Sequence, residues 1–272
     1  MSASVIPNVH VAGREEVRVA LIGCGGRGTG AVAQIFNTDG ATRLVAVADA
    51  FRSKAENAVN SLREHAKGKV DVSDDNIFSG LDAYKQAIDS DANLVVIATP
   101  PGFKPPQFEY AVAKGKHVFM EKPLTADAPT SKRMLALADE ADKKNLKVGV
   151  GLMVRHCRGR RELWDRIQNG EIGDIIAMRA YRQHGPVASA FSKKKPDDKS
   201  ELSYQIDRFH SFLWASGGLF NDFYIHQIDE TCWMKNAWPV SAVASGGRHY
   251  RGIKDGQPDP YGNDYVDQNF DT

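Results

Sequence analysis

The chain has 272 residues, which is long enough for two domains. Its 35 Lys and Arg residues almost balance its 34 Asp and Glu residues, so it lacks the basic surface that nucleic-acid binding requires. The contents of 42% hydrophobic and 25% charged residues are typical of a soluble globular protein. The three cysteines are scattered and show neither a disulfide framework nor a zinc-binding spacing.

The sequence contains no recognisable membrane or export segment. No apolar run approaches the about 18 residues of a membrane span, and residues 1–15 lack the charged and apolar regions of a signal peptide. We therefore expect residues 1–15 to form a loose arm, and we expect no membrane association and, by default, a cytoplasmic location. An exported form would require that a signal peptide had already been removed.

Residues 16–147 alternate between apolar runs and helical patterns. The apolar runs predict buried strands at 16–22, 44–48, 94–99, 116–120 and 147–154. Helices are predicted at 28–37, 52–65, 107–114 and 130–144. This alternation predicts an α/β Rossmann domain with a doubly wound parallel sheet, whose ligands lie at the carboxyl ends of the strands.

Residues 148–272 form a second predicted domain with a different pattern. Helices are predicted at 160–168 and 219–233, strands at 174–181 and 239–246, and loops at 186–203 and 252–262, while the tail 265–272 alternates like a strand. The mixture predicts an α+β substrate domain whose sheet is covered by helices. Because the chain stops inside a predicted strand, we expect this sheet to be incomplete here.

A glycine loop follows the first predicted strand. Gly23 permits a tight turn, Gly25 lets the backbone approach a pyrophosphate, and Gly28 lets the next helix pack closely. The amino terminus of that helix offers N–H groups and a positive dipole end to phosphates. The intervening residues Gly26 and Arg27 therefore join the predicted cofactor-binding set.

Asp49 ends the second predicted strand, at the spacing of an acid that binds the adenosine ribose hydroxyls. This acid favours NAD, although the nearby Arg52 and Lys54 could accept the 2′-phosphate of NADP. The alternative is a glycine-rich turn that binds no ligand. The strand before the loop and the helix after it both disfavour that alternative.

Two further turns follow predicted strands and are candidate sites. Thr99 and Pro100 face the cofactor in this topology, unless they are simply a proline stop. Glu121 and Lys122 follow the strand at 116–120, and an ammonium there can stabilise negative charge that develops on a substrate oxygen. A surface lysine is the alternative.

Asp222, His226 and Asp229 are spaced i, i+4 and i+7, which places all three on one face of a helix. A histidine oriented by carboxylates can accept a proton near neutral pH. The alternatives are a structural histidine and a metal site. We expect no metal, because further ligands are not evident.

Together these motifs resemble the Gfo/Idh/MocA oxidoreductase family, which includes glucose–fructose oxidoreductase and inositol dehydrogenase. The resemblance rests on VALIGCGGRGTG at 19–30, Asp49, ATPPG at 98–102, GKHVFMEKP at 115–123 and GGLFNDFYIHQID at 217–229, and it covers essentially the whole chain from Val17 onward. It implies NAD, or NADP, as cofactor and a sugar or cyclitol as substrate. It also implies a homo-oligomer for the full-length form, with a second domain built on an open, mostly antiparallel sheet.

The resemblance also assigns roles to individual residues. Lys122 is expected to bind substrate near the nicotinamide, and His226 to act as the acid/base. Asp222 is expected to contact substrate or His226. Arg155, with its neighbour His156, is expected to line the substrate cleft.

The chain departs from the family pattern in two places. Many members carry a histidine a few residues after the Thr-Pro motif, whereas this chain has PPGFKPP at 100–106. Phe103 or Lys104 is therefore expected to shape that part of the pocket. Members also continue for several more strands, so we expect this chain to be truncated at its carboxyl end.

Three functions follow from these motifs. We favour an NAD(P)-dependent oxidoreductase that transfers a hydride between nicotinamide and a secondary hydroxyl of a sugar, sugar derivative or cyclitol. An NAD-dependent glycoside hydrolase or lyase that oxidises the sugar transiently would use the same lysine and histidine. A non-catalytic nucleotide-binding protein is the third, and the presence of both Lys122 and His226 disfavours it.

Overall fold

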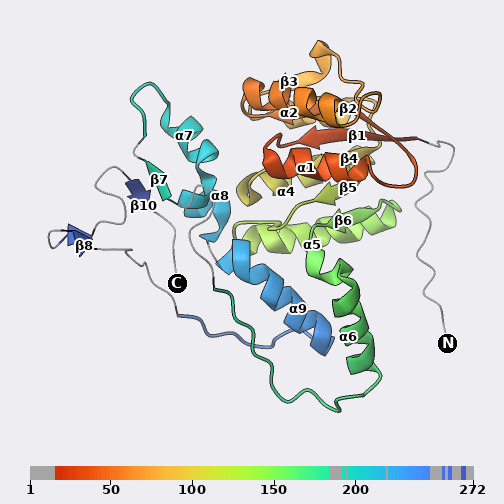
Figure 1. The fold of residues 1–272 in the computed structure, drawn as a ribbon, viewed down its shortest axis with the longest axis vertical. Coiled ribbons are helices and arrows are strands. Elements are labelled where there is room, and N and C mark those ends of the chain that lie inside the picture. The colour runs from red at the N-terminus through yellow and green to blue at the C-terminus, as the bar shows by residue number, and fades with distance from the viewer. Residues whose placement is uncertain are drawn as a thin grey trace. The chain divides into compact units, whose positions relative to one another are not determined.

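The computed structural model describes residues 16–183, 191–193, 195–218, 220–245, 253–254, 257–258 and 265–267. The chain divides into two compact units, which we describe separately (Figure 1). The first unit comprises Met1–Thr99, Lys104–Glu121 and Lys132–Val150, and the second comprises Pro100–Phe103, Lys122–Ser131 and Gly151–Thr272.

The first unit is built on a sheet of six strands in the order β3-β2-β1-β4-β5-β6. All neighbouring strands of this sheet run parallel. The strands are β1 (Glu16–Ile22), β2 (Ala41–Asp49), β3 (Ile77–Ser79), β4 (Leu94–Ile97), β5 (His117–Met120) and β6 (Val148–Val150). The predicted doubly wound parallel sheet is confirmed.

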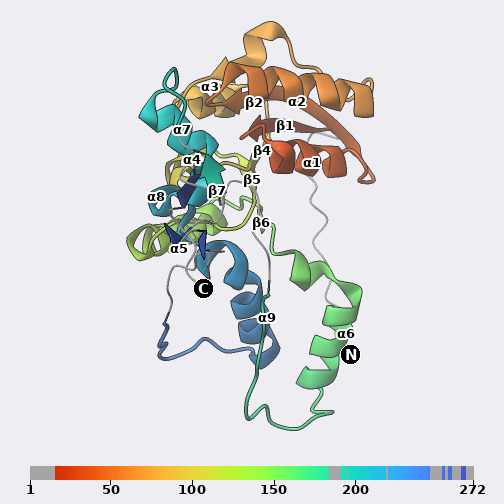
Figure 2. The same ribbon diagram turned by 60° about the vertical axis from the view of Figure 1, so that its left-hand side comes forward.

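Helices cover both faces of this sheet, as Figures 1 and 2 show. They are α1 (Gly26–Ile35), α2 (Arg52–His65), α3 (Ala83–Asp89), α4 (Lys104–Ala113) and α5 (Ala128–Lys143), of which α5 begins in the second unit. Val19 and Leu21 of β1 share a buried core with Val32 of α1 and Val59 of α2. Because side chains alternate along a strand, Ala20 lies on the other face, which α3 and α4 cover.

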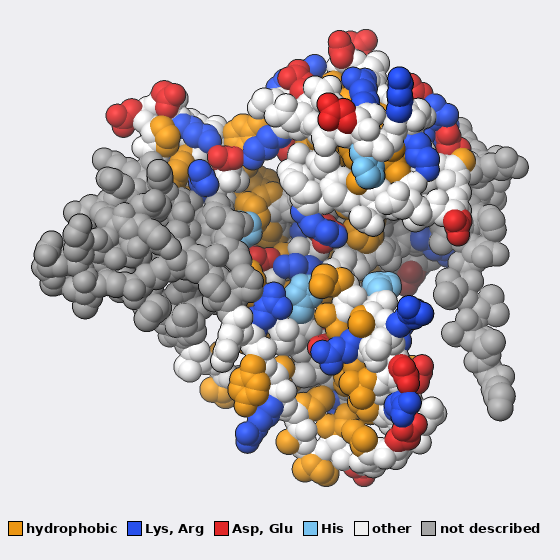
Figure 3. Space-filling model, viewed as in Figure 1, with side chains coloured by type: hydrophobic (Ala, Val, Ile, Leu, Met, Phe, Trp, Pro, Cys, Tyr) orange, Lys and Arg blue, Asp and Glu red, His pale blue; other side chains and the backbone are white. Residues whose placement is uncertain are grey.

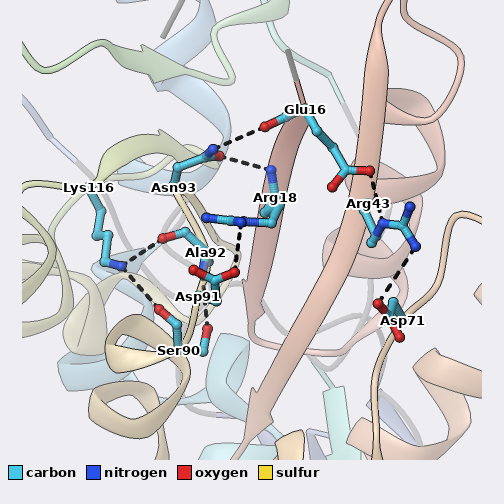
Figure 4. A network of polar contacts seen from close by, with 9 residues as sticks. All are labelled: Glu16, Arg18, Arg43, Asp71, Ser90, Asp91, Ala92, Asn93 and Lys116. Atoms are coloured by element: carbon cyan, nitrogen blue, oxygen red, sulfur yellow. Dashed lines mark hydrogen bonds and ion pairs between the residues drawn. The ribbon is translucent and has the colours of Figure 1, made fainter. Parts of the chain in front are cut away.

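Polar contacts tie the start of β1 to the loop before β4 (Figure 4). The Arg18 guanidinium pairs with Asp91 at 2.7 Å, and its backbone N–H donates to Asn93 Oδ1 at 2.9 Å. Asn93 Nδ2 in turn donates to the carbonyl of Glu16. These bonds lie at the amino ends of the strands, away from the edge where the glycine loop begins.

Four α-helices lie wholly within the second unit among its described residues, together with two short antiparallel strand pairs. The helices are α6 (Arg158–Gln168), α7 (Glu201–Asp207), α8 (Leu213–Ser216) and α9 (Ile225–Lys235), and the strands are β7 (Phe191–Lys193) with β10 (Tyr265–Asp267), and β8 (Ile253–Lys254) with β9 (Gln257–Pro258). Helices α6 and α9 pack through the stacked rings of Trp164 and Trp233, whose centroids are 6.1 Å apart.

The predicted strands at 174–181 and 239–246 are wrong over the residues that the structure describes. Residues 174–181 and 239–245 pair with no strand there, and Gly246 lies outside the described residues. Ile176 is 92% exposed and Val240 is fully exposed. A segment with the composition of a strand becomes one only when a neighbouring strand accepts its backbone hydrogen bonds, and within the described residues these segments have no such neighbour.

The interval between residues 66 and 93 carries no prediction, and it contains β3 and α3. Two predicted loops also need correction. The predicted loop at 186–203 contains β7 and the start of α7, and residues 184–190 and 194 lie outside the described residues. The predicted loop at 252–262 contains β8 and β9.

None of the described helices combines the length and the apolar character that crossing a membrane requires.

Candidate active site

The glycines of the loop after β1 fall into two groups. Gly23 has φ of 91° and donates its N–H to Ala48 O at 2.8 Å, while a methyl group on Gly28 would overlap Gly23 O. These two positions therefore need glycine for packing. A methyl group at Gly25 or Gly26 would meet no atom within 4 Å, so the loop has open space beside it.

The helix that follows the loop has an amino terminus suited to phosphate. Gly25 is the N-cap of α1, and no side chain caps the helix there. The first N–H groups of a helix have no partner within the helix, so they can donate to an anion. This geometry fits the pyrophosphate of a dinucleotide.

Asp49 holds the loop as well as offering an acceptor. Its Oδ2 accepts the Cys24 N–H at 2.8 Å, and its Oδ1 accepts the Phe51 N–H at 2.9 Å. Each carboxylate oxygen retains acceptor capacity for a ribose hydroxyl. The guanidinium of Arg52 is already bonded to Glu56 and to the carbonyl of Ile77.

The turn after β5 is anchored through Glu121. Its buried carboxylate pairs with Arg27 of α1 at 2.6 Å, and its carbonyl accepts the Lys104 ammonium at 2.6 Å. Of the two residues expected to shape the pocket, Lys104 is only 1% exposed and does not line an open surface, while the role of Phe103 stays a prediction. The lysine instead holds the turn, because a buried ammonium must be hydrogen-bonded. Thr99 donates its hydroxyl to Gln107 at 2.6 Å.

Lys122, the first residue of the second unit after β5, lies in a polar cluster. We call Lys122, His210, Asp222 and His226 the Lys122 cluster. The Lys122 ammonium donates to the carbonyl of Asp222 at 2.6 Å and to its carboxylate Oδ1 at 2.9 Å. The other carboxylate oxygen lies 3.5 Å from His210 Nε2. Asp222 thus joins the lysine to a histidine, although Lys122 and Asp222 lie 100 positions apart.

The segment that carries Asp222 is fixed by its own backbone and by Asn221. Gly217 and Gly218 both have positive φ, and a one-turn π-helix (Phe220–Tyr224) follows them. The Asn221 amide donates to the carbonyls of Thr125 and Ser216. Wide turns of this kind are frequent at functional sites, and this one places Asp222 toward Lys122. The Lys122–Pro123 peptide bond, which could have been either isomer, is cis.

His226 is buried at the start of α9. Burial is the largest cause that lowers its pKa below the ordinary 6.5, and the positive charges of Lys122 and Arg182 lower it further. Its imidazole is therefore neutral at pH 7 and able to accept a proton. Its Nδ1 atom is buried and has no hydrogen-bond partner among the described residues.

The prediction that carboxylates on the same helix face orient His226 is wrong. Asp222 binds Lys122 and His210, and Asp229 forms a bidentate pair with Arg155, with N–O distances of 2.8–3.0 Å. Each carboxylate is held by a cation, Asp222 by Lys122 and Asp229 by Arg155, and these charge-assisted hydrogen bonds are stronger than one from a neutral imidazole.

Arg155 and His156, which are both expected to bind substrate, have different surroundings. Arg155 is held by Asp229, and its guanidinium lies 5.7 Å from the Trp233 ring centroid. The His156 side chain is exposed. Neither contacts the Lys122 cluster in the described part of the chain, so their binding of substrate stays a prediction.

Two residues of this region were missed by the sequence analysis. These residues are His210 and Arg182, and none of the sequence motifs includes either of them. The Arg182 guanidinium lies 5.2 Å from the Phe223 ring centroid, and the Lys122 ammonium lies 5.8 Å from the same centroid. No helical or strand spacing links these residues to Asp222, so no local pattern could have found them. Within the described residues, no group of three or more His, Cys, Asp or Glu could hold a metal.

Comparison with known proteins identifies the family of the first part of the chain. The model for the Gfo/Idh/MocA family, an oxidoreductase family with an NAD-binding Rossmann fold, matches residues 17–151. Residues 17–151 of this chain belong to the Gfo/Idh/MocA oxidoreductase family. In this Gfo/Idh/MocA domain the matched residues include the glycine loop, Asp49 and the turn that carries Glu121 and Lys122.

Similar proteins extend the likeness beyond the Gfo/Idh/MocA domain. The glycosyl hydrolase family 109 protein 2 of Shewanella sp. (strain ANA-3) is 32% identical over 60% of this chain and 34% of its own length. The inositol 2-dehydrogenase/D-chiro-inositol 3-dehydrogenase of Lacticaseibacillus casei is 28% identical over 72% of this chain and 53% of its own. The chain therefore spans about a third to a half of the length of these relatives.

A solved structure shows the same fold. The scyllo-inositol dehydrogenase from Lactobacillus casei, solved with bound NAD(H) and scyllo-inositol, superposes with a TM-score of 0.55 at 25% identity. The superposition covers 81% of this chain and 56% of that one. Because 81% of the chain is more than the Gfo/Idh/MocA domain alone, the likeness in fold reaches into the second unit.

Proposed function

We propose that the protein transfers a hydride reversibly between NAD and a secondary hydroxyl of a sugar, sugar derivative or cyclitol. The observation that carries the proposal is the Lys122 cluster. It joins the ammonium of Lys122, which follows β5, to the carboxylate of Asp222, beside the half-buried His210 and the buried His226. The family membership and the inositol dehydrogenases among the similar proteins support it.

In this proposal each residue of the cluster has a separate role at the substrate oxygen. Neutral His226 accepts the hydroxyl proton as the carbon–hydrogen bond is broken. Lys122 has three N–H donors, and Asp222 takes two of them, so one remains for the substrate oxygen. That donor stabilises the negative charge that develops on the oxygen. Asp222 keeps the ammonium oriented.

The cofactor supplies the hydride acceptor, and the first unit fits it. Gly25, Gly26 and the uncapped start of α1 would hold the pyrophosphate, and Asp49 would accept the ribose hydroxyls. We propose NAD rather than NADP, because Asp49 would repel a 2′-phosphate and Arg52 is already engaged by Glu56.

The proposal is tested by adding NAD and a panel of sugars and cyclitols to the full chain and following the absorbance of reduced nicotinamide. We expect at least one polyol to reduce NAD, and Lys122→Met to abolish this while leaving NADH binding intact. The matched control is Lys132→Met, because Lys132 is exposed. Absence of reduction with every polyol, or full activity of Lys122→Met, would contradict the proposal.

A second candidate function is glycoside cleavage by transient oxidation of the sugar. The glycosyl hydrolase family 109 relative favours it, because that protein is 32% identical over 60% of this chain. The same lysine and histidine would remove and return the proton while NAD is regenerated. Release of an aglycone from an aryl glycoside, with no net formation of reduced nicotinamide, would distinguish this activity from simple oxidation.

We further propose that the full-length form is a cytoplasmic homo-oligomer, as the family resemblance implies. Sedimentation of the full-length protein would give its mass in solution. A monomeric mass at micromolar concentration would contradict this part of the proposal.

A further inference from the structure

Arg182 differs from the other cations around the Lys122 cluster. Lys122 pairs with Asp222, Arg155 with Asp229, and Arg160 with Glu230. Arg182 forms no ion pair with any described residue, and its Nε atom is buried without a hydrogen-bond partner. A guanidinium retains its charge at any working pH, so this part of the second unit carries one positive charge that no carboxylate of the described chain offsets.

The charge of Arg182 lies beside the residues that we assign to the reaction. Its guanidinium and the Lys122 ammonium lie over the same ring, that of Phe223, at 5.2 Å and 5.8 Å from its centroid. The two cations also act together on His226, whose pKa both of them lower. A group bound by Arg182 would therefore be close to the hydroxyl handled by Lys122 and His226.

We propose that Arg182 binds a carboxylate of the substrate, so that the preferred substrates are polyhydroxy acids such as hexuronates rather than neutral sugars or cyclitols. This inference rests on the proposed function and narrows its substrate class. A guanidinium is suited to a carboxylate, because its planar N–H groups match the two oxygens.

The charge balance favours a carboxylate over a phosphate. A carboxylate carries a single negative charge, which one guanidinium offsets. A phosphate monoester carries about 1.5 to 2 negative charges at pH 7, and the other two cations near the cluster already have carboxylate partners. A neutral polyol would leave the guanidinium without a counter-charge.

Binding is measured first, because it does not depend on turnover. The full chain, saturated with NADH, is titrated by calorimetry with D-glucuronate and with D-glucose, and likewise with D-galacturonate and D-galactose. We expect each acid to bind at least about tenfold more tightly than its neutral partner, as one charge-assisted hydrogen bond would give. Equal affinities within both pairs, or tighter binding of glucose 6-phosphate than of glucuronate, would overturn the inference.

Variants then identify the residue responsible. Arg182→Gln should remove the preference for the acid, and Arg182→Lys should keep part of it, because the charge is retained but the planar fork is lost. The matched control is Arg179→Gln, which removes the same charge from an exposed position in the same segment and should keep the full preference. An acid preference that survives in Arg182→Gln, or disappears in Arg179→Gln, would overturn the assignment.

Turnover separates this inference from the function on which it rests. If neutral polyols reduce NAD with kcat/KM values equal to those of the acids, the oxidoreductase function stands and the carboxylate site is wrong. If the acids bind through Arg182 but no polyol of either class is oxidised, the carboxylate site stands and the hydride-transfer proposal is wrong.

Discussion

The two units of the chain differ in how far their apolar side chains are exposed. In the first unit Val19 and Leu21 lie in the middle of a parallel sheet and are fully buried. In the second unit Trp238 is 80% exposed, and Figure 3 shows hydrophobic side chains gathered on the surface over α6 and α9. The first unit therefore holds a core of its own, whereas much of the apolar surface of the second is open to water.

This difference separates the places where stability and activity are vulnerable. Burial of apolar side chains is the main favourable contribution to folding, so stability depends most on the β1–β2–β4 region of the first unit. The distinctive feature of the second unit is the partly buried Lys122 cluster. We expect substitutions in this cluster to affect activity more than stability. Four predictions test this division, from the largest expected effect to the smallest.

His226→Gln should lower kcat by about 100- to 10,000-fold, because it removes the group that we propose as the acceptor of the substrate proton. The free energy of unfolding should change much less than the barrier of the reaction, since Gln fills a similar volume. Turnover with the best polyol and urea denaturation measure the two effects. The control is His65→Gln in α2, where the side chain is exposed. A variant that keeps its kcat would show that His226 is only structural.

Leu21→Ala should lower the free energy of unfolding by about 3–5 kcal/mol, because it leaves a cavity in the core of the first unit. Leu135→Ala removes the same atoms from a side chain that is 71% exposed, and it should change stability by about 0.5 kcal/mol or less. Urea denaturation followed by circular dichroism compares them. Equal losses in the two variants would mean that the sheet is not the stable core.

Gly28→Ala should destabilise the first unit by about 1–3 kcal/mol, because the methyl group would overlap Gly23 O. It should also weaken NAD binding, since the loop must shift. Gly30→Ala, two residues later in α1, meets no atom within 4 Å and should stabilise the helix by about 0.5–1 kcal/mol. Calorimetric titration with NADH and thermal unfolding report both changes. A Gly28→Ala variant with unchanged stability and unchanged affinity for NADH would contradict close packing of the loop.

The smallest expected effect is a loss of stability as the pH falls below 6.5, and it involves both units. Burial is the main cause that lowers the pKa values of His117, His210 and His226 below this ordinary value. In that range the unfolded chain binds protons before the folded chain does, so falling pH favours unfolding.

The urea midpoint should therefore decrease between pH 8 and pH 5, and His117→Gln should reduce the decrease. In the native fold the Nδ1 atom of His117 accepts the Lys147 N–H at 2.9 Å, which requires an unprotonated nitrogen. Asp89 does not contribute in this range, because its pKa is lowered from an ordinary value of 3.8. A midpoint that rises toward pH 5 would contradict the prediction.

The first unit was largely predictable from the sequence, because its elements are local. The helix at 52–65 was predicted with the observed bounds, and β1 likewise, since each carries its own periodic pattern. β3 has only three residues, which is too few for a pattern to be seen. The segment at 174–181 was predicted as a strand from its apolar residues, but a strand also needs a partner strand.

The candidate site was predictable only in part. Lys122, Asp222 and His226 were each found from a local motif, and the structure brings Lys122 and Asp222 into contact. The partners of those residues were not predictable, because they depend on tertiary packing. The pairing of Asp229 with Arg155, and of Asp222 with His210, could not be foreseen from helical spacing.

The two hydrogen bonds from Lys122 to Asp222 bear on regiochemistry. A free ammonium attracts any nearby oxygen and discriminates little among the hydroxyls of a polyol ring. An ammonium with two of its three N–H groups fixed points its last N–H along a single direction. Under the proposed function, the orientation of the lysine would select one ring position for oxidation. A variant in which the lysine is less firmly held would then give mixed products before it gave a slow reaction.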